Sequence, residues 1–370
     1  MRNNLPVNLL ERNPTEIDMD TIREALQNKC VLITGAAGSI GSEIVRQAAH
    51  FRPSLVVLCD ISESPLHQLC LELQEYYPEL KFVPLVCDIR NEIRMDLIFS
   101  QYQPQYVYHV AAYKHVPLME THPSESILTN VWGTKILVDL AVRYHAEAFV
   151  MISTDKAVNP SNIMGASKRI AEIYVQSLNA FLQTKSTRFI ITRFGNVLGS
   201  NGSVLIHFEE QIAKGGPVTV THPDIVRYFM TVEEACQLVL EAGTMGHGGE
   251  IFVFDMGEPV KIVDLAEKMI RLSGKEPYKE IDIVFTGLRP GEKLYEELLT
   301  GNEHFVSTRN KRIMIGITDE YESNAYEYSV VTEKLNALIK IAQHYREDDV
   351  VRSIKELVPE FTGSQAELKK

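Results

Sequence analysis

The sequence predicts an α/β protein in which a doubly wound parallel sheet is joined to a smaller, mixed α/β lobe. Three observations favour this class. Short apolar runs alternate with helix-like stretches through the first half, the first apolar run ends in a glycine-rich turn, and the alternation stops after Gly195. The length of 370 residues fits two such parts.

Six apolar runs are expected to be the parallel strands. They cover residues 30–34, 55–59, 82–86, 106–110, 148–152 and 189–192. Helices are expected between several of them, at residues 42–50, 65–77, 130–144 and 164–182. Parallel neighbours need such crossovers, because the chain must return to the same end of the sheet before each new strand begins.

The chain is expected to divide where this rhythm begins and ends. Residues 1–28 precede the first strand and should pack as an arm. Residues 29–198 should form the sheet domain. Residues 199–330, which are less regular and rich in glycine, should form the smaller lobe, in an arrangement that allows interleaving with the sheet. The tail at 331–370 is expected to be helical.

The composition is that of an ordinary globular chain and argues against two classes of partner. Hydrophobic residues make up 45% and charged residues 23%, and the net charge is −12 without a long basic stretch. Binding to nucleic acid needs Lys and Arg to neutralise phosphates, so this charge argues against it. No apolar run approaches the ~18 residues that span a bilayer, and the first residues lack a secretion signal's apolar core. We therefore expect a soluble, cytoplasmic chain with no membrane segment.

Cysteine and histidine are not spaced as disulfide partners or metal ligands. The five cysteines are scattered without a CxxC pair, which is typical of buried free thiols in a reducing compartment. The 11 histidines are dispersed and lack a matching carboxylate or thiolate pattern, so no metal site is expected.

The first glycine-rich turn predicts a dinucleotide site in a Rossmann-type domain. In such a turn, one glycine permits the tight bend, one lets the backbone approach a pyrophosphate, and one lets helix and strand pack closely. The N-terminus of the following helix then faces the phosphates. The residues expected to bind the cofactor here are Gly35, Gly38, Ser39, Ile40 and Gly41. A glycine-rich turn without a ligand is the alternative interpretation.

The ends of the next two strands favour NAD over NADP. Asp60 stands where a carboxylate accepts hydrogen bonds from the adenosine ribose, and it would repel a 2′-phosphate. No Arg follows within residues 61–64 to bind such a phosphate. Asp88 and Ile89, after the third strand, are placed to meet the adenine ring.

Together, the turn TGAAGSIG, the stretch HVAAYKHVP and Asn130 resemble the extended short-chain dehydrogenases. The resemblance implies that Ala111 and Ala112 line the cofactor crevice and that Asn130 fixes the active-site helix. It also implies at least a homodimer, because these enzymes commonly pair through two helices, here near 130–144 and 164–182.

The fifth strand ends in a hydroxyl, a carboxylate and an amine, at Thr154, Asp155 and Lys156. The carboxyl ends of strands in an open α/β sheet face the ligand crevice, so the triplet indicates a reaction site; a polar loop with a surface ion pair is the alternative. The triplet resembles the Thr-Asp-Glu of nucleotide-sugar 4,6-dehydratases, with Lys156 in place of Glu. This implies Asp155 as the acid and Lys156 as the base, with burial lowering the pKa of Lys156.

The family's Tyr-x-x-x-Lys is replaced by Met164-Gly165-Ala166-Ser167-Lys168. Residues four apart share a helix face, so Lys168 should lie beside Met164 and hold the nicotinamide ribose. Met164 cannot take a proton, which leaves two interpretations. One is an inactive NAD-binding scaffold or regulator. The other is a subgroup with Met at this position, the CapD-like UDP-N-acetylglucosamine 4,6-dehydratases of capsule and glycan biosynthesis, which the stretch ISTDKAVNPSNIMGASKRIAE resembles.

Polar residues of the second half are expected to hold a sugar nucleotide. Four of them match diphosphate- and ribose-binding positions of the resembled subgroup: Asn196, Arg227, Arg289 and Glu292. Arg makes bidentate hydrogen bonds to phosphate, and Glu accepts from ribose hydroxyls. Lys114, in the HVAAYKHVP stretch, is also expected to contact the substrate.

The implied reaction converts UDP-N-acetylglucosamine to UDP-2-acetamido-2,6-dideoxy-4-keto-hexose for surface polysaccharide or glycan biosynthesis. The resemblance at Met164 favours retention at C5, and inversion is the alternative, because the sequence does not fix which face of the sugar Lys156 occupies. A UDP-hexosamine 4-epimerase is the alternative, since it shares the NAD cofactor and the oxidation at C4 but needs no acid and base for elimination. Residues 9–14 resemble the segment that joins a membrane-spanning region to the catalytic part of longer members. That likeness implies a cytoplasmic portion of a membrane-anchored enzyme.

Overall fold

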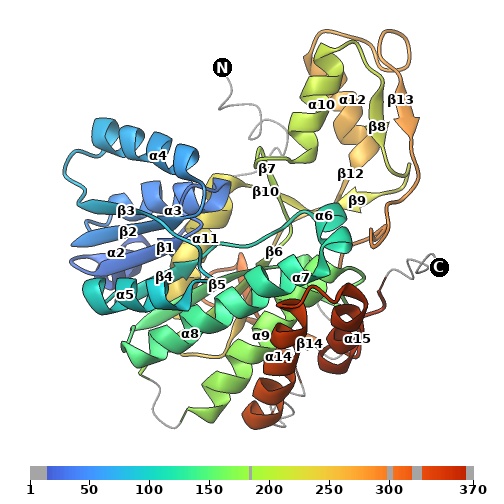
Figure 1. Cartoon of the computed structure of the whole chain (residues 1–370). Helices are drawn as coiled ribbons and strands as arrows, with labels where there is room; N and C mark the ends of the chain where they lie inside the picture. The colour runs from blue at the N-terminus through green and yellow to red at the C-terminus, as the bar shows by residue number, and fades with distance from the viewer. Residues whose placement is uncertain (1–14, 183–185, 298–302, 319–326, 364–370) are drawn as a thin grey trace.

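The computed structural model describes residues 15–182, 186–297, 303–318 and 327–363. Within them, one large sheet carries helices on both faces (Figure 1). Its strands, in spatial order, are β14 (Glu303–Ser307), β15 (Ile313–Thr318), β11 (Ile251–Phe254), β6 (Arg188–Phe194), β5 (Ala148–Thr154), β4 (Tyr106–His109), β1 (Cys30–Thr34), β2 (Leu55–Asp60) and β3 (Phe82–Val86). The strands from β11 to β3 run parallel, and β15 and β14 add antiparallel strands beside β11. This order confirms the predicted doubly wound α/β fold.

The strand order reverses between β1 and β4, which places a ligand crevice at their carboxyl ends. Thr34 and His109 end these two strands and are paired in register. Thr34 Oγ1 lies 2.8 Å from Nδ1 of His109, and Nε2 of the same ring lies 2.8 Å from Thr134 Oγ1. Both strands end at this point, so the glycine turn after β1 and the segment after His109 lie next to each other.

Helices cover the two faces of the sheet and bury its inner strands on both. One face carries α2 (Met19–Leu26), α3 (Ser39–Ala49), α4 (Glu63–Tyr76) and α11 (Val232–Met245). The other carries α5 (Glu92–Tyr102), the π-helix η1 (Ile127–Gly133), α8 (Thr134–Arg143) and α9 (Ile163–Phe181). Along β1, Val31 and Ile33 pack on the first group and Leu32 on the second, as strand alternation requires.

A smaller lobe stands apart from the sheet (Figure 1). It consists of α10 (Val204–Ala213), α12 (Ile262–Leu272) and short strand pairs: β7 (Asn196–Leu198) with β10 (Phe229–Thr231), β8 (Val218–Val220) with β13 (Ile283–Phe285), and β9 (Val226–Arg227) with β12 (Val260–Lys261). These elements share their own apolar cluster. Between α10 and α12 the chain returns to the large sheet through α11 and β11, so lobe and sheet segments are interleaved.

The C-terminal helices pack on the crevice-forming helices rather than standing free. α14 (Tyr328–Ala342) and α15 (Glu347–Leu357) contact α9, and both also contact α7 (Pro123–Ser126). α9 is buried from Ile163 to Asn179 within this single chain. The C-terminal helices thus cover α9 within this single chain. The expectation of at least a homodimer stays a prediction.

Further expectations concern the cysteines, membrane-spanning helices, metal ligands and residues 9–14. All five cysteines are free and buried, as predicted. None of the helices in the described ranges combines the length and apolarity needed to cross a bilayer. In the same ranges no group of three His, Cys, Asp or Glu side chains is placed to hold a metal ion. Residues 9–14, which resemble a linker in longer relatives, lie outside the described part of the chain.

Candidate active site

The glycine turn packs tightly against the chain that leaves β4. Gly35 has a φ of +67°, and a Cβ atom there would lie 2.7 Å from the Ala111 nitrogen. A Cβ atom on Gly41 would lie 2.0 Å from the Gly35 oxygen, so α3 also approaches the turn closely. Gly38 caps α3, and Ser39 and Ile40 begin its first turn. The helix N-terminus and its amide groups therefore face the crevice, as a pyrophosphate requires.

Asp60 ends β2 and holds the turn in place. One carboxylate oxygen accepts a hydrogen bond of 2.8 Å from the Ala37 backbone nitrogen, and the other accepts one of 2.8 Å from Ser62. Asp88, after β3, accepts hydrogen bonds from Arg90. These bonds outweigh burial and lower the pKa of Asp88. Ile89 beside it is buried in the apolar core against Gly133, whereas Asp60 and Asp88 are two fixed carboxylates at this edge.

The first residues of α9 bring a buried amine into the crevice. Met164 and Lys168 are both buried, one helical turn apart, as the spacing predicted. Burial lowers the pKa of Lys168 to about 8, and no hydrogen bond to its amine is found among the described residues. Asn130 donates to Ser167 Oγ on α9 and bonds the backbone of Tyr113, so it ties this helix to the segment after β4. A buried amine that makes no hydrogen bond within the described ranges is compatible with the ribose-binding role predicted for Lys168.

At the end of β5, the predicted triplet forms one hydrogen-bonded group. Asp155 Oδ1 accepts from Thr154 Oγ1 at 2.9 Å and from Lys156 Nζ at 3.0 Å. Lys156 Nζ also donates to Asn196 Oδ1 at 3.2 Å, which joins the triplet to β7 of the lobe. Asp155 is 1% exposed, and its second oxygen, Oδ2, is buried without a hydrogen-bond partner among the described residues. The triplet is thus a buried cluster rather than a polar surface loop.

The charge state of Lys156 depends on its neighbouring carboxylates. Burial alone would lower the pKa of Lys156, but the nearby carboxylates of Asp155 and Glu296 outweigh it and raise that pKa. The prediction that burial near cofactor and substrate lowers this pKa concerns the loaded site and stays a prediction. Without those ligands the neighbouring carboxylates favour the ammonium form, which must lose a proton before Lys156 can act as a base.

A second buried charge cluster lies directly behind the triplet. Glu172, on α9, accepts hydrogen bonds from Ser153 Oγ at 2.6 Å and from Arg193 at 2.7 and 2.9 Å. Arg169 also donates to Glu172 and forms an ion pair with Glu360 near the end of the described chain. The cluster therefore ties β5, β6 and α9 together next to the predicted triplet.

Arg227 and Glu292, two of the predicted substrate-binding residues, lie close together on the lobe side. Arg227 is buried and lies 3.4 Å from Glu292 and 3.6 Å from Glu296. Arg289 is exposed, and only its backbone nitrogen reaches Glu292. The structure thus brings two of these residues together and leaves the Arg289 side chain apart.

The loop after β7 lies over the glycine turn. The Asn201 nitrogen donates to Ser39 Oγ at 3.0 Å. Lys114 Nζ lies 3.5 Å from Ser200 Oγ of the same loop, and Ala112 is exposed in the segment before it. The predicted cofactor turn and the predicted substrate lysine therefore border one crevice.

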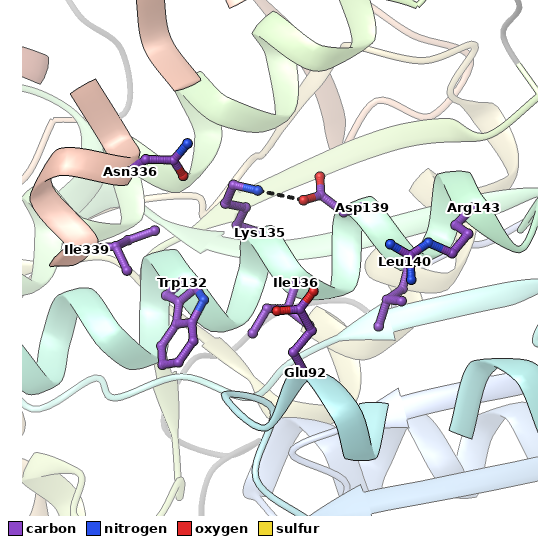
Figure 2. A pocket seen from close by; sticks show the side chains of 9 residues that line it. All are labelled: Glu92, Trp132, Lys135, Ile136, Asp139, Leu140, Arg143, Asn336 and Ile339. Atoms are coloured by element: carbon purple, nitrogen blue, oxygen red, sulfur yellow. Dashed lines mark hydrogen bonds and ion pairs between the residues drawn. The ribbon is translucent and has the colours of Figure 1, made fainter. Parts of the chain in front are cut away.

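A separate cavity of about 230 Å³ lies on the far side of α8, between α5 and α14 (Figure 2). Lys135 and Asp139 form an ion pair of 2.6 Å in its wall, beside Trp132. None of the predicted site residues lines it. It is not part of the crevice described above.

Comparison with known proteins agrees with this geometry. The family described as "Polysaccharide biosynthesis protein" matches residues 31–318. The chain belongs to this family. Among its relatives, the capsular polysaccharide biosynthesis protein CapD of Staphylococcus aureus is 50% identical, over 90% of this chain and 56% of its own length. The probable polysaccharide biosynthesis protein EpsC of Bacillus subtilis is 48% identical, over 83% of this chain and 51% of its own length. The predicted resemblance to CapD-like extended short-chain dehydrogenases is thus confirmed.

Two further proteins are matched over most of their own length. The X-ray structure of Pen from Bacillus thuringiensis superposes with a TM-score of 0.74 at 35% identity, covering 80% of this chain and 90% of Pen. A UDP-glucose 4-epimerase of Rickettsia rickettsii is 32% identical, over 92% of this chain and 98% of its own length. The family member described here spans about half the length of CapD and EpsC.

Two site residues were missed in the sequence. Glu172 stands four residues after Lys168 on the same helix, a spacing that could have suggested a shared face. Glu296 lies four residues after Glu292, but no regular element there gives the spacing meaning. Both are buried carboxylates, a state that depends on contacts distant in sequence.

Proposed function

We propose that this chain is an NAD-dependent UDP-N-acetylglucosamine 4,6-dehydratase that serves surface polysaccharide or glycan biosynthesis. The observation that carries the proposal is the buried Asp155–Lys156 pair at the carboxyl end of β5. A dehydratase needs an acid and a base close together, because a proton leaves C5 while a hydroxyl leaves C6. The similarity to CapD and EpsC supports a role in polysaccharide biosynthesis.

The crevice fits NAD by three features of the chain itself. The tight turn at Gly35 and the N-terminus of α3 suit a pyrophosphate, Asp60 suits an unphosphorylated ribose, and Lys168 suits the nicotinamide ribose. Asp88, Ile89, Ala111 and Ala112 would line the rest of the cofactor site. When bound, NAD would accept hydride from C4 of the sugar and return it to C6.

The residues of the chain would then divide the proton work. For this, the proton shared by the pair would have to move from Lys156 to Asp155. Asp155 would then protonate the departing C6 hydroxyl, and neutral Lys156 would remove the C5 proton and return it to the same face, with retention at C5. Thr154 would hold the Asp155 carboxylate and lie near the 4-hydroxyl. Met164 would replace the usual tyrosine and exclude water without taking a proton. Arg227, Glu292, Asn196, Lys114 and Arg289 would bind the sugar nucleotide.

A UDP-hexosamine 4-epimerase is the second candidate. The similarity to the Rickettsia UDP-glucose 4-epimerase, over nearly that protein's whole length, favours it. An epimerase needs oxidation and reduction at C4 only, so the buried acid and base would have no role in its reaction.

For assembly, we propose at least a homodimer, formed through a surface other than α9.

Incubation with UDP-N-acetylglucosamine, followed by mass spectrometry, tests the proposal. We expect a product lighter by one water, with no net consumption of NAD. A product of unchanged mass would indicate the epimerase, and no product would indicate a binding or regulatory domain. UDP-glucose in a parallel reaction tests whether the N-acetyl group is required.

A further inference from the structure

Glu296 lies in the crevice beside the predicted base but belongs to none of the motifs that identified the site. Its Oε1 atom is 3.5 Å from Nζ of Lys156 and 3.6 Å from Nε of Arg227. The side chain is 4% exposed. One buried carboxylate oxygen therefore lies between the ammonium group of the triplet and the guanidinium group of the substrate lobe.

The charges around Lys156 come from three separate parts of the chain. Asp155 precedes it at the end of β5, Glu296 follows the RPGEK stretch, and Arg227 comes from β9. Asn196 adds a neutral acceptor from β7. An opposite charge within a few ångströms favours the ammonium form, whereas a cation such as Arg227 disfavours it. Two carboxylates against one guanidinium leave the balance in favour of the ammonium group.

We propose that Glu296 is a positioning residue for Lys156: its carboxylate holds the ammonium group toward Asn196 and couples it to Arg227. The inference rests on the proposed function only for the role of Lys156 as the base. It assigns Glu296 no contact with substrate. A sugar-nucleotide diphosphate would pair with the guanidinium group of Arg227. Substrate binding would therefore change the charge next to Glu296 and, through it, the proton affinity of Lys156.

The neighbouring residue offers a matched control. Glu297 accepts a hydrogen bond from Asn159 and lies 3.6 Å from Lys293, and its side chain is 49% exposed. Glu296→Gln and Glu297→Gln remove the same charge from adjacent positions, but only the first faces Lys156. Glu296→Asp keeps the charge and withdraws it by one methylene group.

Titration of Lys156 by NMR tests the proposal on the whole ligand-free chain. The protein would carry ¹³C at lysine Cε, and the Lys156 resonance would be assigned by its loss in Lys156→Arg. We expect Glu296→Gln to lower the titration midpoint of Lys156 by about 1–3 pH units. Glu297→Gln should leave it unchanged, and Glu296→Asp should lower it by less than the Gln variant does.

A second measurement follows the consequence for the reaction. In a dehydratase that uses Lys156 as its base, the rate rises as Lys156 loses its proton, so the rising limb of the pH–rate profile should move to lower pH in Glu296→Gln by the same amount. A wild-type protein that releases no dehydrated product would overturn the proposed function but not this inference, which the NMR titration decides without substrate. If Glu296→Gln does not fold, the Glu296→Asp titration takes its place. A Lys156 midpoint in the folded Gln or Asp variant equal to that of wild type would overturn the inference.

Discussion

Lys156 Nζ lies 3.0 Å from Asp155 Oδ1, so the two groups assigned to elimination form one buried ion pair. Asp155 has no exposed side-chain surface, and the Lys156 side chain is 17% exposed. Groups this close titrate as a pair, and a substitution of one changes the proton affinity of the other. We therefore expect the two substitutions to differ in whether the C5 proton still exchanges with solvent.

Asp155→Asn should stop elimination after oxidation at C4. The variant keeps Lys156 and its contacts with Asn196 and Glu296, so the C5 proton should still exchange with heavy water. Loss of the acid should slow product formation by about 2–4 powers of ten, with reduced cofactor visible by its absorbance. Lys156→Met should stall at the same stage without C5 exchange. Product formation at the wild-type rate in either variant would show that the pair is only a structural ion pair.

Glu172→Gln should destabilise the fold markedly. The carboxylate is fully buried between Arg193, Arg169 and Ser153, so its removal leaves two guanidinium groups short of a partner. Breaking a buried pair in this way costs about 3–5 kcal/mol, measurable by urea unfolding. Glu360→Gln is the matched control. Glu360 is 28% exposed, and its substitution removes only the outer partner of Arg169. Equal losses in the two variants would contradict the linkage of β5, β6 and α9 through Glu172.

The contribution of Glu172 to stability should also depend on pH. Burial opposes its ionisation, but Arg193 and Arg169 outweigh burial and lower the pKa of Glu172. The folded state therefore releases this proton more readily than the unfolded state, whose glutamate pKa is about 4.3. The stabilisation should be complete above that pH and be lost as pH falls through the lower folded pKa. The difference in the free energy of unfolding between wild type and Glu172→Gln should therefore shrink only in that acidic range.

Gly35→Ala should impair cofactor binding as well as stability. Gly35 has a positive φ and would place a new Cβ atom 2.7 Å from the Ala111 backbone. Gly215 also has a positive φ, of 90°, but a Cβ atom there meets nothing within 4 Å. Gly215→Ala should therefore cost only the backbone strain, about 1–2 kcal/mol, and leave NAD affinity unchanged by calorimetry. Equal behaviour of the two variants would argue against a close-packed cofactor turn.

The affinity for NAD should fall as pH rises through about 8. Burial lowers the pKa of Lys168 to about 8, so the amine is charged below that pH and neutral above it. If the charged amine holds the nicotinamide ribose, its loss should weaken binding in calorimetric titrations. Lys168→Met should bind NAD weakly at every pH and lose this dependence. A pH dependence of the same size in Lys168→Met would assign it to another group.

The sheet could be predicted from sequence because its inner strands are buried on both faces and read as continuous apolar runs. The predicted strands at 30–34 and 82–86 coincide with β1 and β3. β5 extends two residues past its predicted end at 152, because Ser153 and Thr154 still pair with β6 although they are polar. Helices α2 and α5 were not expected, since their apolar faces are defined only by the sheet they cover.

The motifs also predicted which residues gather at the crevice, but not their charge states. Burial was expected to lower the pKa of Lys156, and the carboxylate that helps to keep it charged without ligands, Glu296, is 140 residues away along the chain. The covering of α9 by α14 and α15 was likewise missed. Each of these features depends on a contact between distant segments, which local spacing does not encode.

The fate of the hydrogen at C4 tests the central claim most directly. UDP-N-acetylglucosamine carrying deuterium at C4 would be incubated with the protein and NAD, and the product examined by NMR and mass spectrometry. For a 4,6-dehydratase we expect a product that has lost one water and carries the deuterium at C6, within the same molecule. A product of unchanged mass with deuterium again at C4 would contradict it and establish the epimerase.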